Sequence, residues 1–257
     1  MFLRYFIELS YNGKDYHGWQ YQPNAISVQE VIENALSILV GNKTTIVGCG
    51  RTDAGVHATQ YFLHFDHSHQ IEESELIFKL NAFLPNSISV HQLFLVTENA
   101  HARFDAVSRS YEYRIYLGKN PFLLETTWQV QNQEYDLDKM NNASKILLDF
   151  RNFKAFSKSK TDVKTYDCII SRAEWVKVGN HLTFYITANR FLRNMVRAIV
   201  GTLLDVGIGK TTFDGFVKII ENKDRTNAGA SVKAKGLFLT EVKYPENILK
   251  NSDVKKN

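Results

Sequence analysis

A strict two-residue alternation in two stretches is the feature that most constrains the fold. In LRYFIELSY the larger apolar and aromatic side chains fall on every second residue: Leu3, Tyr5, Ile7, Leu9 and Tyr11. The run RSYEYRIYL at 109–117 repeats the pattern. Successive side chains of a strand point to opposite faces, so each run predicts a strand with one buried face. Half-buried strands of this kind are typical of antiparallel sheets covered on one side.

Residues 1–100 show an alternating order of strand and helix signals. Ser27 followed by Glu30 forms a capping-box pattern, and an apolar stripe follows it at Val28, Val31, Ile32, Ala35 and Leu39. The expected elements are a strand at 3–11, a helix from 28, strands at 45–50 and 58–66, a helix at 72–84 and a strand at 88–97. This strand–helix–strand–strand–helix–strand order is ferredoxin-like.

The second half has a similar order without repeating the sequence. The expected elements are a strand at 109–117, a helix at 136–150, strands at 167–178 and 181–189, helices at 190–206 and 212–222, and a strand at 236–244. Gly179–Asn180 is a hairpin signal. The fold class is therefore predicted as α+β, with two halves that each place helices on an antiparallel sheet. We expect the halves at 1–100 and 101–245, followed by a basic, frayed tail at 246–257.

Composition sets broad limits on function and location. The formal net charge of +4 and the pI near 8.9 permit a polyanionic partner without requiring one. The two cysteines, Cys49 and Cys168, form no CxxC pair, so we expect buried, reduced thiols. Arg4 and Glu8 interrupt the first apolar run, which argues against a signal peptide, and no apolar run is long enough to span a bilayer. The expected location is the cytoplasm.

Asp53 is the first candidate for chemistry. It lies in VGCGRTDAGVHA, bracketed by Gly48, Gly50 and Gly55. An Asp before Ala-Gly is good turn chemistry, so a structural Asx turn is one interpretation. The glycines also permit close approach of a ligand, and Arg51 shares a face with Asp53 if the segment is extended. Both interpretations stay open on these residues alone.

Arg197 is the second candidate. The helix FLRNMVRAIVGTLLDVG places it on the border of an apolar stripe that includes Val200 and Leu204. An arginine there either extends its charged end to water or pairs with a carboxylate. Asp53 is a plausible partner, because an arginine would keep that carboxylate ionised.

Aromatic residues form the third feature. Tyr111 lies on the alternating strand beside Arg109, and is either a core residue or a surface on which a base stacks. The loop DYHGWQYQ mixes aromatic and polar residues in a way that suits flipped nucleotides, although packed loops also use this composition.

Other kinds of active site have weaker support. The cluster HFDHSH at 64–69 lacks helical metal-ligand spacing, so we expect no metal site. The sequence carries no Ser-His-Asp signature, P-loop or dinucleotide fingerprint, so no cofactor is expected and carboxylate chemistry is the main option.

At this point the residues resemble a known family. GRTDAGVHA at 50–58 resembles the catalytic motif of the TruA-type tRNA pseudouridine synthases. Five further segments resemble that family in the same order: YHGWQYQPNAISVQEVIENAL, HARFDA, RSYEYRI, FLRNMVRAIVG and GLFLTEVKY. The resemblance covers about residues 1–245.

The resemblance implies a fold, a reaction and an assembly. The family fold is two α+β halves sharing one mostly antiparallel central sheet, with the active cleft between them. The reaction converts uridine to pseudouridine at positions 38, 39 and 40 of the tRNA anticodon arm. It uses neither cofactor nor metal, and the enzymes act as homodimers.

The resemblance also assigns roles to individual residues. It makes Asp53 the catalytic aspartate, Arg197 its ion-pair partner and Tyr111 the residue that stacks on the target base. Arg51 helps to displace the target nucleotide, and Leu237 contributes to an apolar floor. One departure is the stretch NAGASVKAKG at 227–236, which lacks the prolines that many relatives carry.

The proposed chemistry has two rivals. A non-catalytic RNA-binding protein or chaperone on the same fold would bind tRNA without releasing the proton at C5. A carboxylate hydrolase acting on a glycoside or nucleoside would need a second acid near Asp53, and none stands out before Asp66.

Overall fold

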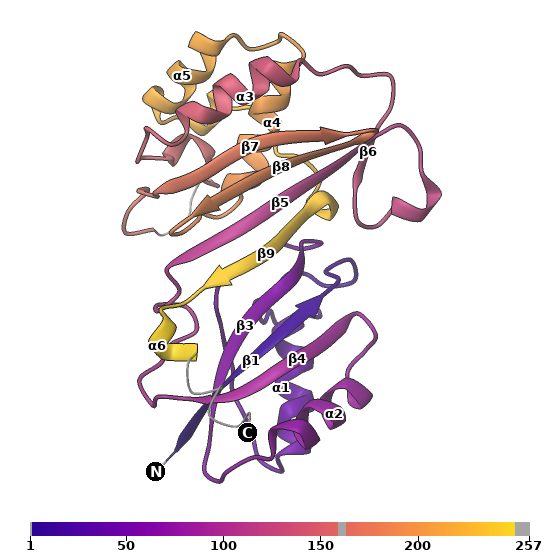
Figure 1. Ribbon diagram of the computed structural model, residues 1–257, viewed down its shortest axis with the longest axis vertical. Coiled ribbons are helices and arrows are strands. Elements are labelled where there is room, and N and C mark those ends of the chain that lie inside the picture. The colour runs from indigo at the N-terminus through magenta and orange to yellow at the C-terminus, as the bar shows by residue number, and fades with distance from the viewer. Residues whose placement is uncertain (1, 159–162, 250–257) are drawn as a thin grey trace. The chain divides into compact units, whose positions relative to one another are not determined.

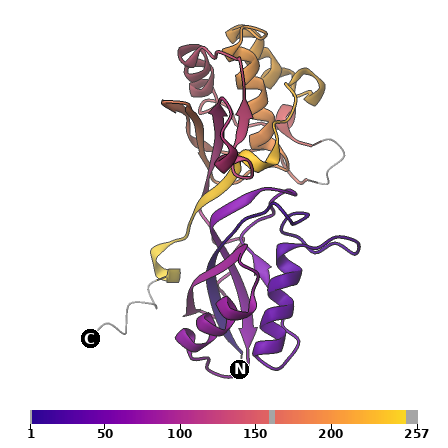
Figure 2. The ribbon, with the colours of Figure 1, turned by 90° about the vertical axis from the view of Figure 1, so that its right-hand side faces the viewer.

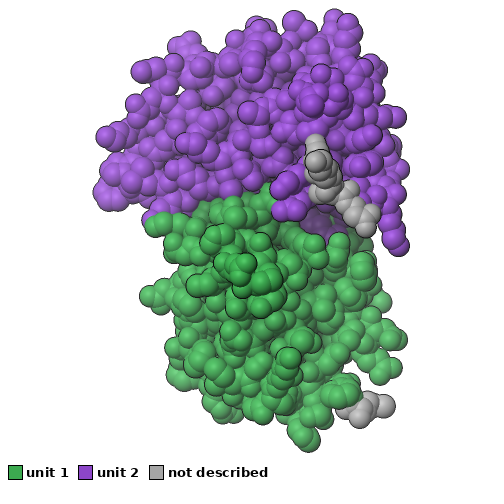
Figure 3. All heavy atoms as spheres, turned by 180° about the vertical axis from the view of Figure 1, so that it is seen from behind, with its two compact units in different colours: residues 1–108, 239–257 green, residues 109–238 purple. Residues whose placement is uncertain are grey.

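The computed structural model describes residues 2–158 and 163–249. The chain divides into two compact units. Unit 1 comprises Met1–Ser108 and Leu239–Asn257, and unit 2 comprises Arg109–Phe238 (Figure 3). The last strand contributes residues to both units.

Unit 1 confirms the predicted order of elements. Its elements are β1 (Leu3–Tyr11), α1 (Val28–Leu39), β2 (Val47–Gly48), β3 (His57–His67), α2 (Glu73–Phe83) and β4 (Ile88–Val96). α1 and α2 lie together on one face of β1, β3 and β4 (Figures 1 and 2). Glu246–Leu249 form a short helix, α6, where we expected an irregular tail, and residues 250–257 of that tail lie outside the described residues.

Unit 2 places its helices against a second group of strands. Its elements are β5 (Ser108–Leu117), β6 (Trp128–Val130), α3 (Leu137–Ile146), β7 (Ile170–Val178), β8 (His181–Ala188), α4 (Met195–Gly207) and α5 (Phe213–Asn222). Helix α3 packs on α4 and on β7. The predicted helix at 190–206 begins five residues late, because Asn194 takes a left-handed conformation with φ 66° directly before α4.

The strands follow the order β4-β1-β3-β9-β5-β8-β7, where β9 is Leu237–Lys243. β1 pairs antiparallel with β3 and β4, and β8 pairs antiparallel with β5 and β7. The short strand β6, which the sequence did not predict, pairs parallel with β5. The fold is therefore α+β with a largely antiparallel sheet, as predicted.

The core of unit 1 explains one departure from simple alternation. Tyr5, Ile7, Leu9 and Tyr11 are buried as predicted, but Phe6 on the opposite face is also fully buried. Its ring stacks on His64 at 5.9 Å and meets the edge of Tyr244 at 5.5 Å. Both faces of β1 are therefore buried at its centre. The alternating pattern predicted one of these faces and missed the face that carries Phe6.

The start of α1 confirms the predicted helix cap. The hydroxyl of Ser27 accepts a hydrogen bond from the Glu30 amide at 3.2 Å. The amides of Val28 and Gln29 donate to the carbonyls of Gly18 and Trp19, at 3.2 and 3.0 Å. These bonds attach the preceding loop to the helix and satisfy groups that a helix end otherwise leaves unpaired.

An asparagine side chain bonds the backbone of one residue on each outer strand of the sheet. On β4, the side chain of Asn81 from α2 accepts from the Val90 amide and donates to the Val90 carbonyl, both at 2.8 Å. On β7, Asn141 from α3 does the same at Trp175, at 2.8 and 3.1 Å. Each amide side chain thus takes the place of a neighbouring strand at one residue and ties a helix to the sheet edge.

Cys49 and Cys168 are both buried and form no disulfide, as predicted. Burial raises the pKa of the Cys168 thiol to about 11, which keeps it protonated near neutral pH. Within residues 2–158 and 163–249, no helix combines the length and the apolar character needed to cross a membrane.

We predict that Asn141→Ala lowers the free energy of unfolding by about 1–3 kcal/mol relative to Asn142→Ala, because it leaves the outward N–H and C=O of Trp175 unpaired. Both positions lie on α3, so the two substitutions change helix propensity equally. Asn142 is exposed and serves as the matched control. Urea unfolding curves measure the difference, and equal midpoints would show that the edge contact adds no stability.

Candidate active site

The segment that carries Asp53 connects β2 to β3 and is held by its own backbone. The Gly55 amide donates to the Tyr16 carbonyl at 3.2 Å, and the Val56 amide donates to the Asp53 carbonyl at 3.1 Å. Gly55 has a φ of 75°, which an L side chain rarely adopts. Backbone bonds therefore close the turn at Asp53.

Thr52 anchors the segment to the core of unit 1. It is buried, and its hydroxyl shares a hydrogen bond of 2.8 Å with the hydroxyl of Tyr11. Its carbonyl accepts from the Trp19 amide at 3.2 Å. The residue next to Asp53 is thus fixed to both β1 and the loop before α1, while Asp53 itself is half-buried.

Three aromatic rings support this anchor. Trp19 stacks on Tyr61 with ring centroids 4.0 Å apart, and Tyr11 meets Tyr61 edge-on at 5.6 Å. The Tyr61 hydroxyl donates to the carbonyl of Gly50. Trp19 and Tyr16 are almost fully buried. The nucleotide-stacking interpretation of the loop DYHGWQYQ is therefore wrong for these two rings, which are core residues that hold the Asp53 segment.

Arg51 has the opposite character. Its side chain is exposed, and its Nε donates to Gln20 Oε1 at 3.1 Å. An exposed guanidinium two residues from a half-buried carboxylate suits contact with a phosphate or a displaced base.

Tyr111 on β5 is half-buried and lies opposite Ile186 of β8. Its ring meets the edge of Phe191 at 5.1 Å, with an angle of 86° between the planes. The core position on this strand belongs to Tyr113, which is fully buried and donates to the Lys233 carbonyl at 2.8 Å. Burial raises the pKa of Tyr113, so it stays a neutral donor.

Arg197 is half-buried on α4 and is tied to the loop before β9. Its Nε donates to the Val232 carbonyl at 2.8 Å, and the Val232 amide donates back to the Arg197 carbonyl at 3.2 Å. The side chain of Asn194 donates to the Ser231 hydroxyl at 2.7 Å, and Arg225 reaches the same hydroxyl at 2.9 Å. These bonds hold the proline-free loop at 227–236.

Leu237 is the first residue of β9 and is buried. Gly236 before it packs closely on Tyr113, and a Cβ there would lie 2.9 Å from the ring. Asp53 and Arg51 thus belong to unit 1, while Tyr111, Arg197 and Leu237 belong to unit 2. The Asp53–Arg197 ion pair and the cleft that would contain it stay predictions.

Comparison with known proteins identifies the family. A family profile described as "tRNA pseudouridine synthase" matches residues 143–245. The chain is 50% identical to tRNA pseudouridine synthase A of Parabacteroides distasonis over 253 residues, which cover 97% of this chain and 99% of the relative. It is 49% identical to the protein of that name from Bacteroides thetaiotaomicron, covering 95% of this chain and 92% of the relative. It is 37% identical to that of Francisella tularensis subsp. holarctica, covering 98% of both. This chain belongs to the tRNA pseudouridine synthase family.

Sequence reasoning missed two residues that support this synthase's candidate site. Phe191 contacts Tyr111, and Tyr61 holds the Gly50 carbonyl. Phe191 gave one signal, because it belongs to an apolar pair, Phe191–Leu192, between Arg190 and Arg193 ahead of α4. Tyr61 gave none beyond strand alternation, since its role depends on which loop packs on it.

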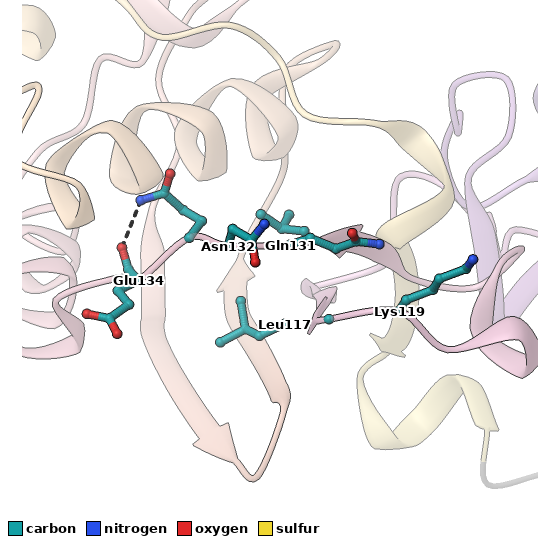
Figure 4. Close-up of a pocket in the computed structure, with 8 residues that line it drawn as sticks. Leu117, Lys119, Gln131, Asn132 and Glu134 are labelled. Carbon is teal, nitrogen blue, oxygen red and sulfur yellow. Dashed lines mark hydrogen bonds between the residues drawn. The ribbon is translucent and has the colours of Figure 1, made fainter.

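The lining of one groove in unit 2 of this synthase includes none of the predicted site residues. A groove of about 670 Å³ in unit 2 is lined by Leu117–Lys119 and Val130–Glu134 (Figure 4). Lys119 and Glu134 are its charged residues. Figure 4 shows these two side chains at opposite ends of the groove, so they do not form an acid–base pair there.

The histidine cluster of this synthase has a structural explanation. His64 is buried, and its Nδ1 accepts from the Ala102 amide at 3.1 Å. Burial, followed by the nearby charge of Arg4, lowers its pKa to about 4. Among the described residues, no group of three or more His, Cys, Asp or Glu side chains is arranged to hold a metal ion.

We predict that Gly48→Ala reduces activity at least about tenfold and lowers stability, because its Cβ would lie 2.6 Å from Trp19 and displace the stack under Gly50. Gly50→Ala is the matched control, since a Cβ there meets nothing within 4 Å. Tritium release from C5-labelled uridine in tRNA and thermal unfolding measure the two effects. Equal behaviour of the two variants would contradict this role of the stack.

We also predict that stability falls as pH drops from about 6.5 to about 4. The unfolded chain protonates His64 near its ordinary pKa of 6.5, whereas the folded chain does so near 4, so the unfolded state binds more protons in this window. His64→Gln should flatten this part of the profile, and His17→Gln, at an exposed position, is the control substitution. Urea midpoints measured across the window test this, and parallel profiles for the wild type and His64→Gln would contradict it.

Proposed function

We propose that this protein converts uridine to pseudouridine in tRNA, at positions 38, 39 and 40 of the anticodon arm, with Asp53 as the essential catalytic group. The observation that carries the proposal is the 37–50% identity, over nearly the whole chain, to proteins named tRNA pseudouridine synthase A. The half-buried Asp53 on a rigidly packed segment supports its role. We further propose that the protein acts in the cytoplasm as a homodimer.

The net reaction needs no external reagent. The bond between C1′ and N1 of the base breaks, and a bond between C1′ and C5 forms. C5 loses a proton and N1 gains one, so atoms and electrons balance within the nucleotide. A protein that supplies only acid, base and electrostatic groups is sufficient, and we propose that neither metal nor cofactor takes part.

The target nucleotide must first leave the RNA stack, at a cost of a few kcal/mol. Arg51 suits this step because its guanidinium is exposed and can occupy the vacated position or hold a phosphate. Tyr111 offers a half-buried ring whose edge-on contact with Phe191 fixes its plane, and a flipped uracil would stack on it.

Asp53 then acts on the glycosidic bond. As a carboxylate it either attacks the sugar or the base, or stabilises the positive charge that develops at C1′ as N1 departs. In the proposed site Arg197 pairs with the Asp53 carboxylate, and its Nε bond to Val232 sets the direction of the guanidinium. Leu237 would close the apolar floor against which the freed uracil turns, and Tyr111 is the candidate base for the C5 proton.

We predict that Asp53→Asn lowers the rate of pseudouridine formation by about a thousandfold or more, because the amide carries no charge and is a poor nucleophile. Affinity for tRNA should stay within about threefold of the wild type. Asp15→Asn, an exposed acid on the loop before α1, is the matched control and should leave the rate unchanged.

The measurements are tritium release from C5-labelled tRNA and a direct tRNA binding titration. Wild-type turnover by Asp53→Asn would refute the catalytic role of Asp53. If the wild type bound tRNA but released no tritium, the protein would instead be a non-catalytic RNA-binding protein.

A further inference from the structure

One part of unit 2 carries a local net excess of positive charge. Three segments, 151–158, 163–168 and 189–193, lie ahead of α4. They carry six of the chain's 31 Lys and Arg residues but one of its 27 Asp and Glu residues. The rest of the chain therefore holds 25 basic and 26 acidic residues. The entire excess of base that gives the chain its charge of +4 belongs to these segments.

Hydrogen bonds join the three segments into one surface. The Phe153 amide donates to the Tyr166 carbonyl at 3.0 Å, and the Cys168 amide donates to the Arg151 carbonyl at 2.9 Å. The Lys158 amide donates to the Arg193 carbonyl at 3.0 Å. Arg190 donates from its guanidinium to the Thr165 carbonyl at 3.3 Å. We call this the basic surface, formed by Arg151, Lys154, Lys158, Lys164, Arg190 and Arg193.

The charged groups of the basic surface face outward. Five of its six residues are exposed, and Arg190 is half-buried. Lys154 places its ammonium over the ring of Tyr166 at 5.7 Å. Asp167 lies within the segments, and the pKa of Asp224 is lowered first by its hydrogen bonds with Thr226 and also by the charge of Lys154. The surface thus keeps a clear excess of cations beside an aromatic ring.

The basic surface adjoins the predicted stacking residue. Arg190 and Arg193 flank Phe191 in the sequence, and Phe191 contacts Tyr111. Arg193 precedes Arg197 by four residues. A nucleotide on Tyr111 would therefore bring its neighbouring phosphates toward this end of the surface. Cations at this position are suited to a phosphate backbone, which lowers the entropy cost of placing the target base.

We propose that the basic surface binds the sugar–phosphate backbone of the substrate RNA and supplies most of the electrostatic part of its affinity. This inference rests on the proposed function for the identity of the polyanion, but the binding step does not require catalysis. A local excess of base attracts a polyanion, and these segments provide one.

The test variant is Lys154→Gln/Lys158→Gln/Lys164→Gln. It leaves Arg190 and Arg193 intact, since these adjoin Phe191. The matched control is Lys145→Gln/Lys177→Gln/Lys218→Gln, which removes three exposed charges elsewhere in the same unit. Both variants have the same net charge. A difference in their affinity for RNA therefore depends on where the lost charges lie and not on the total charge.

In direct titrations with unmodified tRNA transcript, the test variant should bind about tenfold or more weakly at about 0.15 M salt. The slope of log affinity against log salt should become less steep by about two to three, because each lost phosphate contact removes about 0.7–0.9. In turnover assays the loss should fall mainly on KM. The control should match the wild type, and thermal unfolding should show that both variants fold.

Equal affinity and equal salt slope in the test and control variants would overturn the inference. The same titrations in the Asp53→Asn background separate it from the proposed function. Wild-type protein that makes pseudouridine while the two triple variants bind alike would refute the basic surface alone. Wild-type protein that binds through the surface but makes no pseudouridine would refute the proposed function alone.

Discussion

The packing of Trp19 on Tyr61 is the interaction on which the proposed reaction centre depends. Tyr61 belongs to β3 and Trp19 to the loop before α1, so their stack joins two parts of unit 1 that are far apart in sequence. The backbone at Gly50 and Thr52 hydrogen-bonds to these same residues. A carboxylate that reacts with one atom of a sugar needs a fixed backbone, because a small displacement of the carboxylate lowers the reaction rate steeply. These large aromatic side chains position the Asp53 segment and do not bind the nucleotide.

The elements that local patterns determine were predictable, and those that depend on packing were not. The Ser27 cap and the strand at 3–11 follow from residues close in sequence, and the structure confirms both. Phe6 shows the limit, since its burial requires Tyr244, which comes from the other end of the chain. The late start of α4 depends on the left-handed backbone of Asn194, a conformation that the apolar periodicity of the helix does not reveal.

For the candidate site, sequence patterns indicated which types of residue are present better than they indicated the burial and contacts of those residues. The loop DYHGWQYQ illustrates this. Its composition is typical of a nucleotide-binding surface, but its Trp19 is buried like a core residue. The loop at 227–236 gives the opposite lesson. It contains no proline, yet side-chain bonds from Asn194, Arg197 and Arg225 hold it. Residues on other elements thus supply a constraint that a local motif would otherwise provide.

The two asparagines at the sheet edges have a consequence for self-association. A strand from another molecule can extend an open sheet only where outward N–H and C=O groups are available. At Val90 and Trp175 those groups are already bonded to Asn81 and Asn141. An incoming strand would have to displace a helix-borne amide at each edge before it could form a continuous ladder. Addition of a strand from another molecule is therefore disfavoured at these two residues of the sheet borders.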